Sequence, residues 1–259
     1  MPSDEWGNAM LLKGKTAVIS GAASRRGIGR ATARLFARHG ARVAVLDLDA
    51  VEAGAAAAEL GAGHLGVACD VTDAAACTRA AAAVIGAFGA VDILINNAGI
   101  TQPLKLMEIG AREWDAVLDV NLRGVLLLSQ AFIPHMRARR QGAIACMSSV
   151  SAQRGGGIFG GPHYSAAKAG VLGLAKAMAR ELGPDGIRVN CVTPGLIQTD
   201  ITGGRLTDDM KREIAGEIPL GRLGEAEDVA GVFLFLACDL SAYVTGAVID
   251  VNGGMLIHG

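Results

Sequence analysis

The 259-residue sequence predicts an α/β fold, in which one doubly wound parallel sheet of seven strands carries helices on both faces. Three observations lead to this fold class. Short apolar runs alternate with longer helical patterns along the whole chain. The runs are almost continuously apolar, as expected for strands that are buried on both faces. No linker rich in proline or serine divides the sequence, so we expect residues 1–259 to form a single domain.

The predicted strands are the apolar runs at residues 16–20, 42–47, 65–70, 92–96, 143–148, 188–193 and 247–251. The predicted helices between them span residues 29–39, 50–60, 74–88, 112–139, 164–182 and 225–238. Parallel strands joined by helices require right-handed crossovers, and ligands of such sheets bind beyond the carboxyl ends of the strands. We therefore expect the functional residues directly after the strands. The first 12 residues are expected to make little contact with the core.

The composition excludes several classes of protein. With 51% hydrophobic and 19% charged residues, the chain is not intrinsically disordered, and 24 basic against 25 acidic residues give no electrostatic footprint for nucleic acid. The acidic start lacks the layout of a secretion signal, and the longest purely apolar stretches, such as residues 232–238, are too short to span a bilayer. The five cysteines form no C-x-x-C pair and no H-E-x-x-H motif occurs, so no metal site is expected. We expect a cytoplasmic protein without nucleic-acid or membrane partners.

The first predicted strand leads through a glycine-rich loop directly into a helix, as in a Rossmann domain. Gly21, Gly27 and Gly29 permit a tight turn and a close approach of the backbone to a pyrophosphate, which the N-terminus of a helix attracts. A glycine loop alone is weak evidence, but its position between a strand and a helix strengthens the interpretation. Arg26 and Ile28 of the same loop are therefore further candidates for contacting a dinucleotide.

Asp47 ends the second predicted strand, 18 residues after Gly29. A carboxylate at this position can accept both ribose hydroxyls of NAD and repel the additional phosphate of NADP. Arg25 and Arg26 favour the opposite choice, because guanidinium groups can bind that phosphate. We favour NAD, since a mobile loop side chain hardly offsets like charge at the 2′ position; NADP remains the alternative.

A tyrosine and a lysine in a later helix are the candidates for the chemistry. Tyr164 and Lys168 are four residues apart, so they share one helical face. A neighbouring positive charge lowers the pKa of an acid by about 1–3 units, which would bring the phenol towards the range of an efficient acid–base catalyst. Ser149 follows the fifth predicted strand, and Asn121 lies in the long preceding helix.

These motifs, taken in order, resemble those of the short-chain dehydrogenase/reductase family, and the resemblance covers essentially the whole chain. Besides the Y-x-x-x-K motif, residues 96–99 match the N-N-A-G motif of the family. Two departures stand out. The glycine loop begins with Ser20 instead of threonine and has two extra residues between Gly21 and Gly27, and the segment from Ser149 to Tyr164 is about two residues longer than usual.

The resemblance implies hydride transfer between a nicotinamide cofactor and a secondary alcohol or its ketone. It implies that Ser149 steadies the substrate oxygen, Tyr164 exchanges its proton, and Lys168 tunes Tyr164 and binds the nicotinamide ribose. Asn121 would position a water that connects Lys168 to solvent. Further cofactor contacts are implied at Asp70, Val71, Asn97, Ala98, Gly99, Pro194, Gly195, Ile197 and Thr199. The long helices and the C-terminal segment resemble the surfaces with which the family forms homotetramers.

Two stretches are predicted to form the substrate pocket. The glycine-rich segment 150–163 would form one wall, and residues 200–216 a mobile lid. Arg154 and His163 are candidate contacts of an anionic or polyhydroxylated substrate. The simpler interpretation is that Arg154 faces solvent and His163 caps the helix.

The preferred hypothesis is NAD-dependent catabolic oxidation of a sugar, polyol or hydroxy acid. The alternative is an NADPH-dependent 3-oxoacyl reductase acting on carrier protein or CoA substrates, although such family members carry no acidic residue at the position of Asp47. A serine hydrolase is disfavoured because no G-x-S-x-G elbow occurs. A non-catalytic NAD-binding sensor would lack some of the reacting residues, whereas Asn121, Ser149, Tyr164 and Lys168 are all present.

Overall fold

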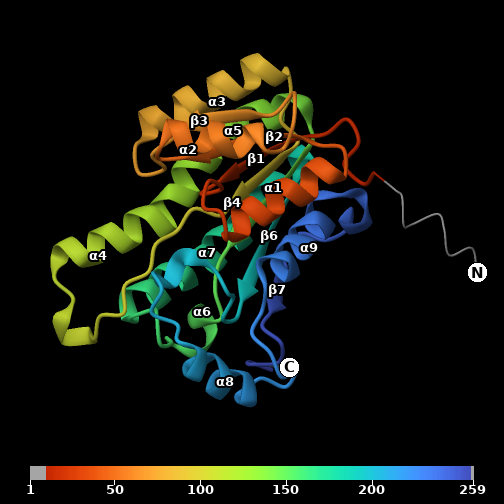
Figure 1. Cartoon of the computed structure of the whole chain (residues 1–259). Coiled ribbons are helices and arrows are strands. Elements are labelled where there is room, and N and C mark those ends of the chain that lie inside the picture. Colours follow the sequence, from red (N-terminus) through yellow and green to blue (C-terminus); the bar gives the residue numbers. More distant parts are fainter. Residues whose placement is uncertain (1–9, 258–259) are drawn as a thin grey trace, which may run out of the picture.

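The structure, a computed structural model, describes residues 10–257 and is built around one parallel sheet (Figure 1). Its strands lie in the order β3-β2-β1-β4-β5-β6-β7, and each pairs in parallel with its neighbours. Their bounds are β1 (Thr16–Ser20), β2 (Arg42–Asp47), β3 (Leu65–Ala68), β4 (Ile93–Asn96), β5 (Gly142–Met147), β6 (Ile187–Pro194) and β7 (Val248–Val251). The predicted fold class is confirmed.

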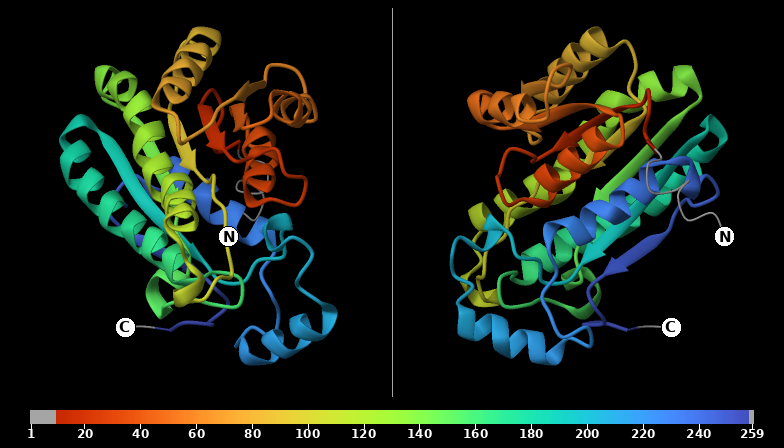
Figure 2. Two further views of the ribbon diagram at one scale, coloured as in Figure 1. Left: turned by 90° about the vertical axis from the view of Figure 1, so that its left-hand side faces the viewer. Right: turned by 45° about the vertical axis from the view of Figure 1, so that its right-hand side comes forward.

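Helices cover both faces of this sheet (Figure 2). On one face lie α1 (Ile28–Arg38), α2 (Ala50–Ala58) and α9 (Ala226–Ala237). The other face carries α3 (Ala74–Phe88), α5 (Gly124–Arg139) and α7 (Pro162–Leu182). The remaining helices are α4 (Ala111–Leu118), α6 (Ser151–Arg154) and α8 (Asp208–Glu217).

The central strands are apolar throughout because each of their two faces packs into a core. In β1, Ala17 and Ile19 point to the cluster with α1, α2 and α9, whereas Val18 points to the cluster with α3, α5 and α7. All three side chains are fully buried. Burying a valine or isoleucine side chain contributes about 1.5–3 kcal/mol, so this continuous apolar run is stable only inside a sheet covered on both sides.

The predicted helix over residues 112–139 is interrupted. Helix α4 ends at Leu118, a π-helical turn spans Asp119–Arg123, and α5 follows. Within the turn, the Asn121 side chain donates a hydrogen bond to the carbonyl oxygen of Val117 over 2.9 Å, in competition with the backbone ladder. Such turns occur frequently at functional sites. By length and composition the whole stretch Ala111–Arg139 could cross a membrane, but core helices pass the same test, and several of its apolar side chains are buried in the core.

Two further expectations need correction. The Leu12 side chain is fully buried and its backbone N–H donates to the carbonyl of His39 over 2.9 Å, so the core contacts begin before residue 13; residues 1–9 lie outside the described residues. The predicted lid 200–216 contains the helix α8, which sequence reasoning missed. Thr207 caps this helix, its hydroxyl accepting a hydrogen bond from the Met210 backbone N–H over 3.3 Å.

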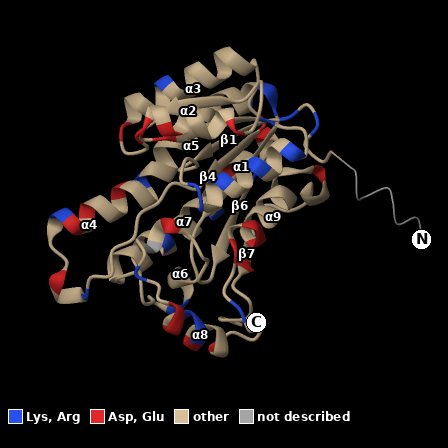
Figure 3. Cartoon of the chain, viewed as in Figure 1, with Lys and Arg blue, Asp and Glu red and all other residues tan. Residues whose placement is uncertain are grey.

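The topology fixes where a ligand can bind. From β1 the chain proceeds to β2 on one side of the sheet, and from β4 it proceeds to β5 on the other. The loops that follow β1 and β4 therefore diverge and leave a crevice beyond their carboxyl ends. Charged residues of both signs are scattered over the helices (Figure 3).

Candidate active site

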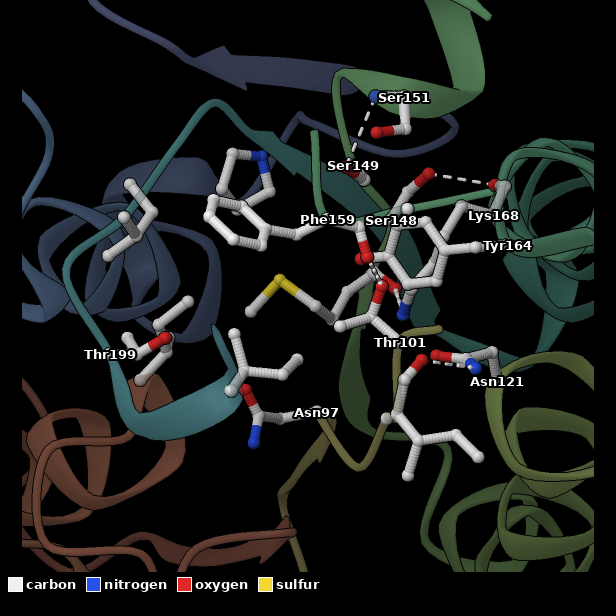
Figure 4. A pocket seen from close by; sticks show the side chains of 18 of the residues that line it. Asn97, Thr101, Asn121, Ser148, Ser149, Ser151, Phe159, Tyr164, Lys168 and Thr199 are labelled. Atoms are coloured by element: carbon white, nitrogen blue, oxygen red, sulfur yellow. Dashed lines mark hydrogen bonds between the residues drawn. The ribbon is translucent and has the colours of Figure 1, made fainter. Parts of the chain in front are cut away.

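One cavity of about 740 Å³ lies at the carboxyl edge of the sheet, in the predicted position (Figure 4). The predicted site residues that line it are Gly21, Gly27, Ile28, Asp47, Asp70, Val71, Asn97, Ala98, Gly99, Asn121, Ser149, Arg154, Tyr164, Lys168, Pro194, Gly195, Ile197 and Thr199. Three predicted residues, Arg26, Gly29 and His163, are not among its lining residues.

The four predicted catalytic residues converge from three elements. Tyr164 and Lys168 lie on successive turns of α7, and the Lys168 ammonium is 5.7 Å from the centre of the Tyr164 ring. Ser149 follows β5, and its hydroxyl is close enough to the Tyr164 phenol to lower the pKa of that phenol. Figure 4 shows Ser149, Tyr164 and Lys168 at one side of the cavity and Asn121 close by.

The two neighbouring serines are held differently. The Ser148 hydroxyl donates to the backbone carbonyl of Lys168 over 2.8 Å, so it ties β5 to α7. The Ser149 hydroxyl instead accepts a hydrogen bond from the Ser151 N–H over 3.1 Å and is free to donate into the cavity. Of the two, Ser149 is therefore the serine that can meet a substrate oxygen.

Burial dominates the electrostatics of the pair on α7. It lowers the pKa of Lys168 to about 8, opposed by the nearby thiols of Cys146 and Cys191. It raises the pKa of Tyr164 above the ordinary value, opposed by the hydrogen bond with Ser149. In the chain on its own, desolvation of the phenolate thus keeps the pKa of Tyr164 above the ordinary value, and the lowering expected from Lys168 and the nicotinamide ring stays a prediction for the complex with cofactor.

Asn121 is fully buried and positioned by the π-helical turn. Its amide nitrogen donates to the carbonyl oxygens of Ile100 and Val117, each over 2.9 Å, while its Oδ1 finds no partner among the described residues. A Cβ atom on Gly99 would lie 2.7 Å from that Oδ1 and 3.4 Å from the Lys168 Nζ. The unpaired acceptor and the ammonium thus converge over Gly99, which leaves room for a small polar bridge between them.

Asp47 is fixed at the other end of the cavity. One carboxylate oxygen accepts the Ala23 N–H over 2.8 Å and the other accepts the Leu48 N–H over 2.9 Å. These bonds hold the carboxylate against the glycine loop while it lines the cavity. Gly29 has a supporting role instead, since a Cβ there would lie 2.6 Å from the Asn97 amide nitrogen. This close contact packs the start of α1 against the loop after β4.

Known proteins share this arrangement. A family model described as enoyl-(acyl carrier protein) reductase matches residues 21–256. The uncharacterized short-chain type dehydrogenase/reductase y4mP of Sinorhizobium fredii is 71% identical over 254 residues, which cover 96% of this chain and 100% of that protein. The chain belongs to the short-chain dehydrogenase/reductase family. It is an oxidoreductase that acts on CH–OH or keto groups and binds a nicotinamide cofactor.

Two proteins with named activities are also similar to this chain. The 3-oxoacyl-[acyl-carrier-protein] reductase of Escherichia coli is 42% identical over 246 residues, covering 95% of this chain and 99% of its own. A crystal structure of the 3-ketoacyl-(acyl-carrier-protein) reductase of Brucella melitensis, complexed with NADH, has a TM-score of 0.88 and 35% identity, covering 95% of this chain and 100% of that one.

The long glycine loop of this oxidoreductase binds the start of the lid. The Ser24 hydroxyl and the Arg26 N–H both donate to the same oxygen of Asp200, over 2.9 and 3.2 Å. The Arg26 guanidinium lies 4.0 Å from the other oxygen, and both side chains are largely exposed. Arg26 therefore faces Asp200 and is not among the residues that line the cavity.

The second departure from the family, the longer wall before Tyr164, is joined to the loop after β4. The Thr101 hydroxyl donates to the carbonyl of Phe159, and the Gly161 N–H donates to the carbonyl of Gln102 over 2.9 Å. His163 is fully buried, with its Nε2 3.1 Å from the Gln102 side-chain oxygen. Its ring connects the two loops behind the wall, so the structure does not bring His163 into the lining of the cavity.

The predicted wall and lid both contribute to the lining, through residues such as Ile158, Phe159, Ile201 and Ile214. Lining residues outside these stretches were missed by sequence reasoning, and they include Ser24, Leu48, Leu196, Glu217 and Met255. Ser24 stands inside the quoted glycine loop, so its position was a usable signal. The apolar ones carry no chemical motif, and Met255 reaches the cavity only through the tertiary fold.

Proposed function

We propose that this enzyme transfers a hydride between NAD(H) and a secondary alcohol or its ketone, using Ser149, Tyr164, Lys168 and Asn121. One observation carries the proposal. A half-buried phenol, close to the Ser149 hydroxyl and next to a buried ammonium, lines the same cavity as the fixed carboxylate of Asp47. That combination suits proton exchange at one end and recognition of a dinucleotide at the other.

The residues of the cavity fit a nicotinamide dinucleotide. Asp47 offers carboxylate oxygens to ribose hydroxyls, and the start of α1 offers the positive end of a helix to a pyrophosphate. Thr199 lies across the cavity from Tyr164 and Lys168 (Figure 4). When bound, the dinucleotide supplies the acceptor or donor of the hydride. Asp47 supports NAD over NADP by like-charge repulsion, and Arg26 faces Asp200, which removes one of the two arginines that favour NADP.

Each reacting residue has a separate task in the proposal. The Ser149 hydroxyl donates to the substrate oxygen and orients it. In oxidation, the ionised phenol of Tyr164 takes the hydroxyl proton, and in reduction it returns that proton to the oxygen. The Lys168 ammonium stabilises the phenolate electrostatically. The unpaired Oδ1 of Asn121 and the Lys168 Nζ converge over Gly99, which supports a water between them as the path by which the proton reaches solvent.

The cofactor preference expected from Asp47 bears on the physiological direction of the reaction, for which there are two candidates. The preferred hypothesis is oxidation with NAD, as in the catabolism of alcohols and hydroxy acids. The second candidate, reduction of a 3-oxoacyl thioester, is favoured by the names of the relatives at 42% and 35% identity, one of which was crystallised with NADH. The two candidates share the reacting residues and differ in the substrate and in its physiological direction.

The test compares initial rates with NAD and NADP for the wild type and for the variant Asp47→Ala. We expect the wild type to prefer NAD by about tenfold or more in kcat/KM, since a desolvated like charge at the 2′ position costs at least 1.4 kcal/mol. Asp47→Ala should raise the KM for NAD. In Asp47→Ala/Asp200→Ala, the released Arg26 should improve NADP further, whereas Asp200→Ala alone should not reverse the preference. A wild type that prefers NADP tenfold would contradict the role of Asp47.

Assembly and location complete the proposal. Trp114 and Leu126 on the helices α4 and α5 are more than a third exposed, and Tyr243 near the C-terminus is fully exposed. Exposed apolar side chains on these elements support the homotetramer implied by the family resemblance. Sedimentation analysis tests it, and a monomer would refute it. The cytoplasmic location stands on the sequence features alone.

A further inference from the structure

We infer that the substrate carries its hydroxyl or keto group on an aliphatic or alicyclic body and not on a polyhydroxylated one. The inference rests on the proposed function and names the class of substrate that the same site accepts. It departs from the sugar and polyol substrates that the sequence suggested.

The substrate half of the cavity is apolar. Beyond Ser149 and Tyr164, the cavity is lined by the wall segment after β5, by the lid and by the C-terminal segment. The side chains that these segments contribute include Val150, Ile158, Phe159, Ile201, Ile214 and Met255. A hydrocarbon body can pack against all of them, and such lining with a few polar groups is typical of small-molecule sites.

Few polar groups in this half remain available for a sugar. The Thr101 hydroxyl is already committed to the carbonyl of Phe159. The charged side chains that these segments add to the lining are Arg154, Asp200 and Glu217. All three are exposed, and one carboxylate oxygen of Asp200 already accepts from the Ser24 hydroxyl and the Arg26 N–H. A polyol would lose several hydrogen bonds to water on entering and would regain few of them, which disfavours its binding.

Two exposed isoleucines strengthen the inference. Ile158 on the wall is 56% exposed and Ile201 at the start of the lid is 46% exposed, although both line the cavity. Ile214, on helix α8 of the lid, belongs to an apolar cluster with Ile218 and Leu223, against which Met255 packs. An apolar substrate body would cover the exposed isoleucines and continue this cluster. Water would otherwise meet that apolar surface.

The experiment measures reduction of neutral ketones by NADH with the purified full-length enzyme. The arms are 2-octanone and 4-methylcyclohexanone as apolar ketones, D-fructose and dihydroxyacetone as polyhydroxylated ones, and 2,3-butanedione as a small activated reference. We expect kcat/KM for the apolar ketones to exceed that for the polyhydroxylated ones by about 100-fold. A 3-oxooctanoyl thioester is compared with 2-octanone to show whether the enzyme prefers the aliphatic ketone free or attached as a thioester. Both substrates have an aliphatic body, so faster turnover of either one supports the inference.

A matched pair of variants locates the effect. Ile158→Asn should lower kcat/KM for 2-octanone, relative to that for 2,3-butanedione, by about tenfold. Val51→Asn alters a 77% exposed side chain outside the cavity and should leave this ratio unchanged. Ile201→Asn should act as Ile158→Asn does.

Failure of the inference and failure of the proposed function give different results. If fructose or dihydroxyacetone is reduced as efficiently as 2-octanone, or if the isoleucine variants leave the ratio unchanged, the substrate class is wrong while the reaction stands. If no ketone is reduced, including 2,3-butanedione, or if Tyr164→Phe reduces it as fast as the wild type, the proposed function itself fails.

Discussion

The Lys168 ammonium donates a hydrogen bond to the carbonyl oxygen of Met147 over 2.9 Å from a side chain that is only 2% exposed. One neutral acceptor does not replace the water that a buried cation loses, and burial therefore holds the pKa of Lys168 at about 8. The buried Lys168 ammonium is placed where the proposed reaction needs it, and its burial lowers the free energy of unfolding.

This cost has a defined pH window. Below pH 8 the lysine is protonated in both the folded and the unfolded chain, and the penalty of burying the charge is fully present. Between the folded pKa of about 8 and the ordinary value of 10.5, the unfolded chain binds more protons, so the free energy of unfolding rises with pH. From pH 7 to pH 10, we expect a gain of roughly 2 kcal/mol for the wild type relative to Lys168→Met.

Urea unfolding at both pH values measures the gain. Groups that titrate equally in both proteins cancel in the difference, which isolates Lys168. If the free energy of unfolding of the wild type minus that of Lys168→Met is independent of pH, or falls as the pH rises, the lysine is not held with a lowered pKa.

Tyr164 should titrate above its ordinary pKa in the free enzyme, because burial disfavours the phenolate more than the Ser149 hydrogen bond favours it. The chain contains two tyrosines, and Tyr243 is fully exposed. The absorbance difference at the phenolate band between the wild type and Tyr164→Phe therefore reports Tyr164 alone. Addition of NAD should move this titration to lower pH, because the positive nicotinamide ring favours the anion.

The activity of the same variant completes this prediction. General acid–base catalysis contributes about 10²–10⁴-fold, so Tyr164→Phe should lower kcat by at least 10² at pH 7–9. In the oxidation direction the wild-type rate should rise with pH until the phenol is ionised. A phenol that titrates below its ordinary pKa in the free enzyme would contradict the burial seen in the structure.

The elements that sequence reasoning located well are those fixed by local chemistry. β1 and β2 have the predicted bounds, since their apolar runs have turn residues at both ends. Tyr164 and Lys168 meet because a spacing of four residues places them on one helical face. Residues governed by distant contacts were harder to place. Arg26 turns away from the cavity because Asp200, 174 residues later, binds its backbone N–H.

The substrate half shows a further limit of sequence reasoning. Its apolar lining comes from separate segments that carry no motif, such as Ile158 on the wall and Met255 near the C-terminus. The π-helical turn at Asn121 was equally invisible, because the periodicity on both sides of it is that of an ordinary helix. The sequence predicted the wall and the place of Asn121 in the site, but only the tertiary structure shows that Met255 reaches the same cavity.

Gly99→Ala should disable the connection between Asn121 and Lys168. The new methyl group would lie 2.7 Å from the buried Asn121 Oδ1 and 3.4 Å from the Lys168 Nζ, so at least one of these atoms has to move. We expect kcat to fall about tenfold or more, since small misplacements of catalytic groups have large effects. The matched control is Gly86→Ala in α3, where a Cβ meets no atom within 4 Å. The control should retain full activity and gain up to about 1 kcal/mol of stability. Equal activities of the two variants would show that Gly99 has no part in the catalytic site.

Arg154 and His163 were predicted together as substrate contacts, and the structure separates them. Arg154 lines the cavity and is exposed, whereas His163 is buried against Gln102 behind the wall. Arg154→Met should therefore lower kcat/KM for an anionic ketone such as 3-oxooctanoate by about tenfold relative to neutral 2-octanone, which corresponds to a lost exposed charge contact of about 1.4 kcal/mol. His163→Asn should change both substrates by the same factor, because it loosens the wall without altering the charge that the substrate meets. If Arg154→Met affects the two ketones equally, the guanidinium faces solvent and has no part in recognition. If His163→Asn discriminates between them, the ring reaches the substrate after all.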